Sequence, residues 1–420
     1  MIMSIDKSIT THKKVLYGAL KNKFLRISLA RTVENYRQNW EKVIEMFPDL
    51  PKKANKLRKI RQKTLENLWY YIDLARERFE MKGINTYLAK DAEEARRIIG
   101  EICEGKLVVK SKSLTTEEIK LNKYLEELGA EVWETDLGEL IIQLAKSKPM
   151  HLVTPAIHIP KEKVAEIFSE IAGKPLPPDP KILVSFARKF LREKYFKADV
   201  GITGVNVIAA DSGSMFIVEN EGNIRFVSNA PPIHIAIAGI EKIVPTFVDA
   251  ALQVDVLAKY AGFITPSYVS IISDVSKTAD IEKMRVEGVH GPREVHLILL
   301  DNGRSKMLED ERFREALLCI RCGACLYECP VYQTVCGYFG DYLFGGIGAI
   351  WMSFIDGLEK TAPYLYTCML CGKCREVCPM RIDVPRMILT LREEANRAGL
   401  TPRKLSAIEQ VLYEKGNIYG

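Results

Sequence analysis

The chain has 420 residues, and its 47% hydrophobic content is enough to bury more than one core, so we expect two or three domains. The formal net charge is +6, but the lysines and arginines are spread along amphipathic helices and are not interleaved with aromatic residues in one patch, so we expect no nucleic-acid partner. The sequence has no recognisable secretory signal, and we expect a reducing, cytoplasmic setting.

Residues 1–83 are helical in pattern and heavily charged. Two amphipathic stretches, 31–47 and 54–83, are separated by Pro48 and Pro51, and proline interrupts a helix because it lacks an amide hydrogen. The sequence therefore predicts an N-terminal helical arm over 1–83.

In residues 84–305, short apolar runs alternate with helical stretches. We expect strands at 86–88, 106–110, 131–134, 151–154, 200–208, 215–218 and 294–300. Strands that alternate with helices in this way are typical of a mostly parallel sheet with helices on both faces. The middle domain is therefore predicted to be α/β.

The segment after the expected strand 106–110 is the first candidate ligand site. Thr115 and Glu118 match a capping box for a helix that begins at Thr116, and exposed amides beside two lysines at a helix start favour an anion. The alternative is that the lysines are simply solvated. The candidate residues are Lys110, Ser111 and Lys112.

Three further features of the middle domain are candidates. Small residues in 201–206 and 209–214 let the backbone approach a ligand near Asn206, but they serve tight turns equally well. The segment 219–225 first of all indicates a hairpin turn. His234 is either a proton carrier or a hydrogen-bonded core residue. The candidates within 219–225 are Asn220, Glu221, Gly222, Asn223 and Arg225.

Residues 306–420 contain the most specific motif, the string C-x2-C-x2-C-x3-C-P, in two copies. Three cysteines of each copy can surround one cubic cluster while the fourth projects toward the other, which predicts two 4Fe-4S clusters. The crossed assignment places Cys378 with the first three cysteines of copy one, and Cys329 with the first three of copy two. The copies are Cys319, Cys322, Cys325 and Cys329, and Cys368, Cys371, Cys374 and Cys378.

Other uses of these cysteines fit less well. A structural zinc site uses two Cys or His pairs, and disulfide scaffolds are short and secreted. Cys103 lies in an apolar helical pattern and is expected to be a buried small hydrophobe, whereas Cys336 is left open between packing and a ligand role. The apolar run 343–355 is too short to span a bilayer and is expected to be a buried helix, with contact to a membrane or a partner as the alternative.

A series of short phrases, in this order and ahead of two ferredoxin strings, resembles the lactate-utilisation iron-sulfur protein family, the B-type subunit of a three-part lactate oxidation system. The phrases stand at 109–113, 116–119, 134–139, 201–206, 220–223, 239–245, 291–296, 301–304 and 319–325. The resemblance extends from about residue 33 to residue 391.

The resemblance implies a LUD-type α/β middle domain, similar to the sugar-phosphate isomerase and CoA-transferase fold, followed by an α-helical ferredoxin domain over 306–420. It also implies a role in oxidising L-lactate to pyruvate, with a cysteine-rich subunit and a smaller protein carrying the same middle domain as partners. Neither cysteine string can take a hydride from a hydroxy acid, so a flavin or metal site on a partner is expected to hold the substrate.

We therefore expect an iron-sulfur electron-transfer subunit of a multi-subunit L-lactate oxidoreductase. The segments 337–341 and 344–348 depart from the family pattern, so another partner set or another 2-hydroxy acid is an alternative. A second alternative is an adaptor in a heterodisulfide-reductase-like complex. A third is an acyl- or CoA-handling enzyme with Glu221 as the nucleophile and regulatory clusters. A transmembrane segment is not expected.

Overall fold

The computed structural model describes residues 5–418, which begin with an arm of four helices. They are α1 (Ile5–Lys21), α2 (Lys23–Met46), α3 (Leu50–Glu66) and α4 (Leu68–Glu80). α2 ends before Pro48, and Pro51 lies in the first turn of α3, where its missing amide hydrogen costs no helical bond. The predicted helical arm is confirmed, whereas its boundary at residue 83 remains a prediction.

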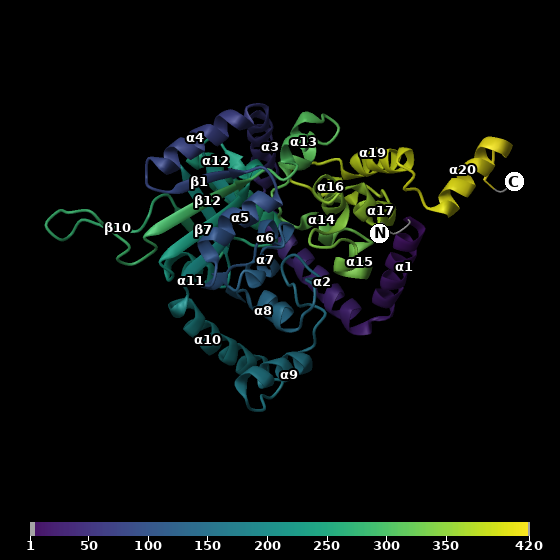
Figure 1. Ribbon diagram of the computed structural model, residues 1–420. Coiled ribbons are helices and arrows are strands. Elements are labelled where there is room, and N and C mark those ends of the chain that lie inside the picture. The colour runs from purple at the N-terminus through teal and green to yellow at the C-terminus, as the bar shows by residue number, and fades with distance from the viewer. Residues whose placement is uncertain (1–4, 419–420) are drawn as a thin grey trace.

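The centre of the molecule is a six-stranded sheet in which every neighbouring pair is parallel (Figure 1). The strand order is β1 (Asn85–Ala89), β12 (Glu294–Leu300), β7 (Ile233–Gly239), β4 (Val200–Gly204), β2 (Leu107–Lys110) and β3 (Glu131–Glu134). Parallel strands need crossover connections, and the sequence supplies a helix in most of them. The α/β prediction is confirmed.

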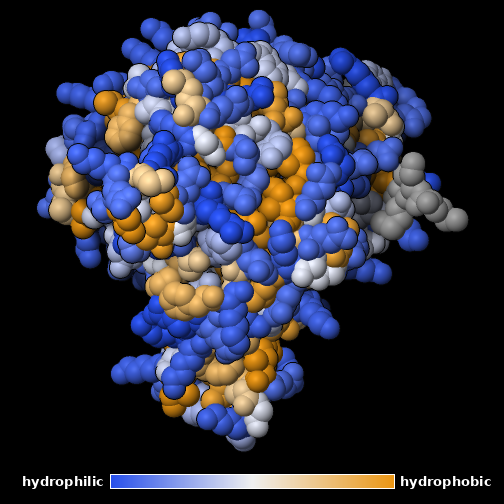
Figure 2. All heavy atoms as spheres, turned by 60° about the vertical axis from the view of Figure 1, so that its left-hand side comes forward, coloured by the Kyte–Doolittle hydropathy of each residue, from blue (hydrophilic) through white to orange (hydrophobic). Residues whose placement is uncertain are grey.

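Helices cover both faces of this sheet. Successive side chains of a strand point to opposite faces, so Val108 packs with α5 and α7 while Val109 packs with α8, α9 and α10. The helices α9 and α10 form a lobe that projects from the body, and apolar side chains are visible on it in Figure 2. The helices of this region are α5 (Ala92–Cys103), α6 (Leu114–Glu118), α7 (Leu121–Glu127), α8 (Leu137–Leu144), α9 (Lys161–Ala172), α10 (Pro180–Lys197), α11 (Asn223–Asn229), η1 (Ile240–Lys242) and α12 (Phe247–Tyr260).

Two strand predictions are wrong. The segment 151–154 is a loop, and the expected strand 200–208 is divided between β4 and a second sheet. The chain changes sheets because Val205 donates its amide to Ile237 of β7, whereas Asn206 donates its amide to Phe216 of β6. The second sheet has the order β8 (Ile243–Val244), β5 (Val207–Ala209), β6 (Ser214–Glu219) and β9 (Tyr268–Ile272), and a separate hairpin pairs β10 (Lys277–Thr278) with β11 (Val286–Glu287).

The turn predicted at 219–225 is not a hairpin, because β6 leads directly into α11. Gly222 stands before the helix with a φ of +80°, and the carboxylate of Glu219 accepts the amides of Ile224 and Arg225. These bonds satisfy free amides at the start of α11, whereas in a hairpin the same amides would pair with the preceding strand.

The predicted capping box is also wrong. Ser113, not Thr115, precedes α6, and the carboxylate of Glu118 turns away to Arg304. The pattern of residue types was correct for a helix start, but a distant arginine binds the carboxylate instead.

The cysteine-rich region after residue 303 is built from short helices and loops. Its longest apolar run forms α16, whose Trp351 is completely buried, so the buried-helix prediction for 343–355 is confirmed. The elements are α13 (Arg304–Glu309), η2 (Arg314–Leu318), α14 (Ala324–Tyr327), α15 (Tyr332–Val335), η3 (Cys336–Tyr338), α16 (Gly345–Ile355), α17 (Leu358–Thr367), α18 (Lys373–Glu376), α19 (Val384–Arg397) and α20 (Arg403–Lys415).

The helical arm joins the middle domain to the cysteine-rich region, as Figure 1 shows for α2 and α3. Arg61 of α3 is buried and donates to the carbonyls of Leu317 and Leu318 on one side and of Glu241 on the other, at 2.8 to 3.1 Å. Tyr36 of α2 stacks on Tyr327 with a 4.0 Å centroid separation. One apolar core therefore runs through all three parts of the chain.

Candidate functional site

The two cysteine strings adopt the same local conformation. Each first cysteine follows a helical turn, and the residue before each second cysteine is left-handed, with a φ of +62° at Arg321 and +57° at Leu370. Gly323 and Gly372 are left-handed as well, at +81° and +80°, and each opens a one-turn helix. The repeat seen in the sequence is therefore a repeat of backbone geometry.

The fourth cysteine of each string lies with the other string. Cys378 faces Cys319 and Cys322, and these thiols share one cavity with Cys325. Cys329 faces Cys368 and Cys371 beside a second cavity that Cys374 also lines. Cys325 and Cys374 each border both cavities, which places the two groups side by side.

The surroundings of these thiols suit a buried inorganic group with sulfur ligands. Burial and the neighbouring cysteines raise the pKa of Cys374 to about 12, and burial raises that of Cys378 to about 11, so nearby cations are needed for thiolates to persist. In the described part of the chain, no three His, Cys, Asp or Glu side chains converge on a position for a single metal ion. The thiols line two adjacent cavities, and groups of cysteine sulfurs of this kind suit iron-sulfur clusters.

The other two cysteines lie apart from both cavities. Cys336 is buried and donates its thiol to the carbonyl of Met150 at 2.8 Å, so the structure favours packing over a ligand role. Cys103 is completely buried at the end of α5, as expected for a small hydrophobe.

A separate cavity of about 260 Å³ lies where β2, β4 and β7 end, and we call it the strand-end cavity. Of the predicted ligand residues, it brings together Lys112, Asn206 and Asn220. Ligand sites of parallel sheets are commonly at this edge, where the carboxyl ends of the strands meet. Cys322 lines the same cavity, so the first cysteine group borders a possible ligand space.

Sequence reasoning missed three charged residues of the strand-end cavity, namely Glu241, Lys242 and Arg321. Glu241 and Lys242 lie in η1, which directly follows β7, and β7 is buried along its whole length. Charged residues at the carboxyl end of a buried parallel strand are the signal that could have identified them.

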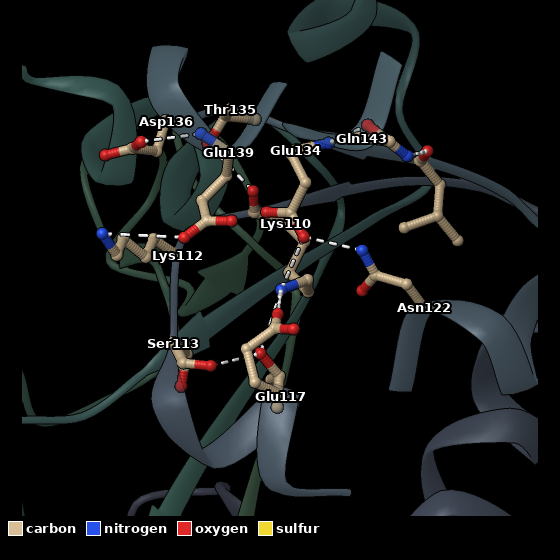
Figure 3. Close-up of polar contacts among 12 residues, drawn as sticks. Lys110, Lys112, Ser113, Glu117, Asn122, Glu134, Thr135, Asp136, Glu139 and Gln143 are labelled. Atoms are coloured by element: carbon tan, nitrogen blue, oxygen red, sulfur yellow. Dashed lines mark hydrogen bonds and ion pairs between the residues drawn. The ribbon is translucent and has the colours of Figure 1, made fainter. Parts of the chain in front are cut away.

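Lys110 is not part of an exposed anion site, which corrects that expectation. Figure 3 shows its ammonium group between Glu134, at 2.8 Å, and Glu117, at 3.2 Å. Burial alone would lower the pKa of Lys110, but these carboxylates raise it above its ordinary value. Ser111 is also buried, with its amide bonded to the carbonyl of Ile202. Lys110 and Ser111 therefore stabilise the sheet end.

Lys112 differs from Lys110 because it lies two residues beyond the end of β2. Its ammonium group is buried, lies 3.6 Å from Glu139 and has no hydrogen-bond partner within residues 5–418 (Figure 3). Burial, opposed by Lys112, raises the pKa of Glu139 to about 7. Of the two predicted lysines, only Lys112 can therefore reach a ligand.

The candidates in 219–225 hold the chain turn in place. Asn223 donates to Thr135 at 3.2 Å, and Arg225 pairs with Glu219 while its guanidinium lies 3.9 Å from the centre of the Tyr268 ring. The carboxylate of Glu221 accepts the amide of Leu137 and does not line the strand-end cavity. Burial raises the pKa of Glu221.

His234 is a core residue. It lies near the start of β7, is completely buried, and shares a 2.8 Å hydrogen bond with Thr203. Burial, aided by His296, lowers its pKa to about 4, so the ring is neutral near pH 7. Of the two readings of His234, the structure supports the hydrogen-bonded core histidine.

Comparison with known proteins gives the class of protein first. The family model described as LUD domain matches residues 72–300, and the one described as 4Fe-4S dicluster domain matches residues 315–382. The chain is thus an iron-sulfur protein with a LUD domain. Three similar relatives are called Lactate utilization protein B, from Bacillus thuringiensis (strain Al Hakam), Bacillus cereus (strain AH187) and Bacillus anthracis (strain A0248). Each is 38% identical over 394 residues, with 90% of this chain and 79% of the relative covered, and the chain belongs to their family.

A solved structure of a DUF162 family protein from Deinococcus radiodurans is also similar, at 14% identity and a TM-score of 0.30. The similarity covers 56% of this chain and 98% of that chain. Among residues 5–418, no helix combines the length and the apolar character that crossing a bilayer requires.

Proposed function

We propose that this chain is the iron-sulfur electron-transfer subunit of a multi-subunit L-lactate, or related 2-hydroxy-acid, oxidoreductase in the cytoplasm. The observation that carries the proposal is the position of the cysteine groups between a cavity and the surface. Cys322 lines the strand-end cavity, whereas Cys371 of the other group is exposed beside Met369, which is 68% exposed. Electrons can thus enter near the cavity and leave at the surface.

Two 4Fe-4S clusters would occupy the two cysteine groups with crossed ligands. Cys319, Cys322, Cys325 and Cys378 would hold the first cluster, and Cys368, Cys371, Cys374 and Cys329 would hold the second. When bound, each cluster supplies one-electron transfer. The protein keeps the ligands oriented, since Arg392 donates to the carbonyls of Leu365 and Cys368 next to the second group.

Backbone amides also point at the ligand sulfurs. The amides of Ile382 and Met380 favour the thiolate form of Cys378 and lower its pKa against the effect of burial, and those of Tyr332 and Val331 do the same for Cys329. Hydrogen bonds to ligand sulfurs stabilise the more negative, reduced state of a cluster. In the proposed clusters, these amides would therefore raise the reduction potentials.

Partner subunits are needed for the dehydrogenation step, which removes two electrons and two protons from the acid. Cysteine ligands offer no hydride acceptor, so a flavin-containing, cysteine-rich or second LUD-type subunit would supply that chemistry. The relatives' name, Lactate utilization protein B, supports lactate as the acid. The acyl-transfer alternative has no support from the geometry, since Glu221 lies outside the strand-end cavity.

Electron paramagnetic resonance on the complex, purified without oxygen through a tag on this chain, tests the proposal. Adding L-lactate is expected to produce a reduced 4Fe-4S signal, and Cys371→Ser is expected to remove one of the two cluster signals. Cys103→Ala is the matched control and should leave both signals intact. If dithionite reduces the clusters but lactate does not, the adaptor alternative replaces the lactate assignment.

A further inference from the structure

The strand-end cavity has an arrangement that electron transfer alone does not require. Its walls include apolar side chains, such as Leu114, Leu152 and Phe263, and Cys322 lies at one side. Three cationic side chains also line it: Lys112, Lys242 and Arg321. A volume of about 260 Å³ lies below the usual range for drug-sized ligands, which favours a small molecule over a dinucleotide.

Positive charge is in excess in this cavity. The two carboxylates on its wall, Glu118 and Glu241, are both bound by Arg304, which is itself completely buried. Among the described residues, neither Lys242 nor Arg321 forms an ion pair. Lys242 donates only to neutral oxygens, the carbonyl of Val205 at 2.7 Å and the hydroxyl of Thr115 at 3.3 Å.

The pKa of Lys242 agrees with an excess of positive charge in the cavity. Burial and two nearby arginines, Arg321 and Arg304, lower its pKa to about 8 despite the adjacent Glu241. A bound anion would relieve the repulsion among these cations. The cluster of charges therefore favours a negatively charged ligand.

The repeated cysteine strings supply an internal comparison for Arg321. Leu370 occupies the same position in the second string, with nearly the same left-handed backbone, so the turn itself does not require arginine. The guanidinium of Arg321 lies 4.1 Å from the centre of the buried Trp351 ring, which holds the side chain in place. Only the string that borders the cavity carries the cation.

Glu241 adds a hydrogen-bond acceptor. Its Oε2 binds Arg304, but its Oε1 is buried and has no hydrogen-bond partner in the part of the chain that the structure describes. A buried acceptor without a partner is costly, and a ligand hydroxyl group would satisfy it. Gly239 makes this arrangement feasible, because a Cβ there would lie 2.0 Å from Glu241 Oε2 and 2.4 Å from Arg304 Nε.

We propose that the strand-end cavity binds a small 2-hydroxy carboxylate, with its carboxylate held by Lys112, Lys242 and Arg321 and its hydroxyl donating to Glu241. The acid would then lie on this chain, directly beside the cysteine group that contains Cys322, instead of only on a partner. The proposal deepens the proposed function, and it rests on that function for the choice of L-lactate as the probe. Binding itself requires no electron transfer.

Anaerobic calorimetry on the full cluster-containing chain tests the proposal with L-lactate, acetate and inorganic phosphate as separate probes. L-lactate is expected to bind in the millimolar range or tighter. Acetate, which lacks the hydroxyl, should bind about tenfold more weakly, since one hydrogen bond to a charged acceptor is lost. Binding of phosphate but not lactate would overturn the proposal, as would the absence of lactate binding.

Two variants locate the site. Arg321→Leu copies the residue of the second string, and Lys242→Gln removes a cation far from the cysteine strings in sequence; each should weaken lactate binding at least about tenfold. Lys123→Gln, which changes an exposed lysine of α7, should leave binding unchanged. Iron content is measured for every variant, and if Arg321→Leu loses iron, Lys242→Gln decides. Unchanged affinity in Lys242→Gln would overturn the assignment. Dithionite reduction of the same samples tests the electron-transfer proposal separately.

Discussion

Arg304 binds Glu118 through both terminal nitrogens, at 2.8 and 2.9 Å, although the two residues are 186 positions apart and both are buried. The pair joins the first helix of the cysteine-rich region to the helix that follows β2. Removing one partner of a buried ion pair costs more than the pair contributes, because the other charge is left without compensation.

Arg304→Met should therefore lower the free energy of unfolding by about 3 to 5 kcal/mol, since Glu118 and Glu241 would both lose their partner. Anaerobic urea unfolding measures the change. Arg97→Met is the control, because Arg97 and Glu101 form an exposed pair whose loss should cost no more than about 0.5 kcal/mol. Equal costs for the two variants would contradict the expectation.

Arg61→Met should loosen the arm from the first cysteine string. The variant leaves three carbonyls without their donor. Two of them, those of Leu317 and Leu318, stand directly before Cys319, and the third belongs to Glu241. We expect faster proteolysis of α3 and faster loss of iron to a chelator, each measured over time without oxygen. Lys59→Met on the exposed face of the same helix should match the unchanged protein.

The stability of the fold should depend on pH through Glu139. Its folded pKa, about 7, is raised from the ordinary 4.5, so its contribution is fully present below pH 4.5 and is lost as the pH rises through 7. At about 1.4 kcal/mol per pKa unit, the loss amounts to about 3 kcal/mol. The groups that face Glu139 are Lys112, Lys110, Glu134 and Glu117.

Glu139→Gln removes this titration. As the pH rises from 5 to 8, the free energy of unfolding of the variant should increase relative to that of the unchanged protein, as measured by urea unfolding at each pH. Glu101→Gln, at an exposed position, should show no such gain. A parallel pH dependence of the unchanged protein and Glu139→Gln would contradict the raised pKa of Glu139.

Two glycines should respond in opposite directions to alanine. A Cβ at Gly201 would lie 1.8 Å from the carbonyl oxygen of Val227, so Gly201→Ala should cost about 3 kcal/mol or more. Gly18 lies inside α1 with open space around it, so Gly18→Ala should stabilise the protein by about 1 kcal/mol or less through helix propensity. Thermal unfolding of both variants measures the contrast, and a loss of stability in Gly18→Ala would contradict it.

Local patterns in the sequence predicted the α/β class, the helical arm and most strands, because hydrophobic periodicity directly reflects burial. The ferredoxin-type motif could also be recognised from the sequence, because the spacing of its cysteines fits a fixed cluster geometry. Lys110 and Lys112 could not be told apart in this way. They look alike in the sequence, but Lys110 ends a strand and points into the protein, whereas Lys112 lies beyond it.

The strand-end cavity could not be derived from the sequence, because its charges come from segments that only the fold brings together. Lys112 follows β2 and Lys242 follows β7, whereas Arg321 belongs to the first cysteine string. The predicted capping box failed for a similar reason, because the carboxylate of Glu118 binds Arg304, 186 positions away. The predicted hairpin at 219–225 failed for a local reason, because the carboxylate of Glu219 accepts the amide of Ile224 at the start of a helix.

The contacts of the helical arm bear on the order of events during synthesis. Arg61 leaves the ribosome long before Leu317 and Leu318, its partners 256 and 257 positions later. The apolar face of α3, including Leu57 and Leu65, consequently has no complete surface to cover it until most of the chain has been translated. The arm can thus close on Leu317 and Leu318 only after the segment that contains them has been translated.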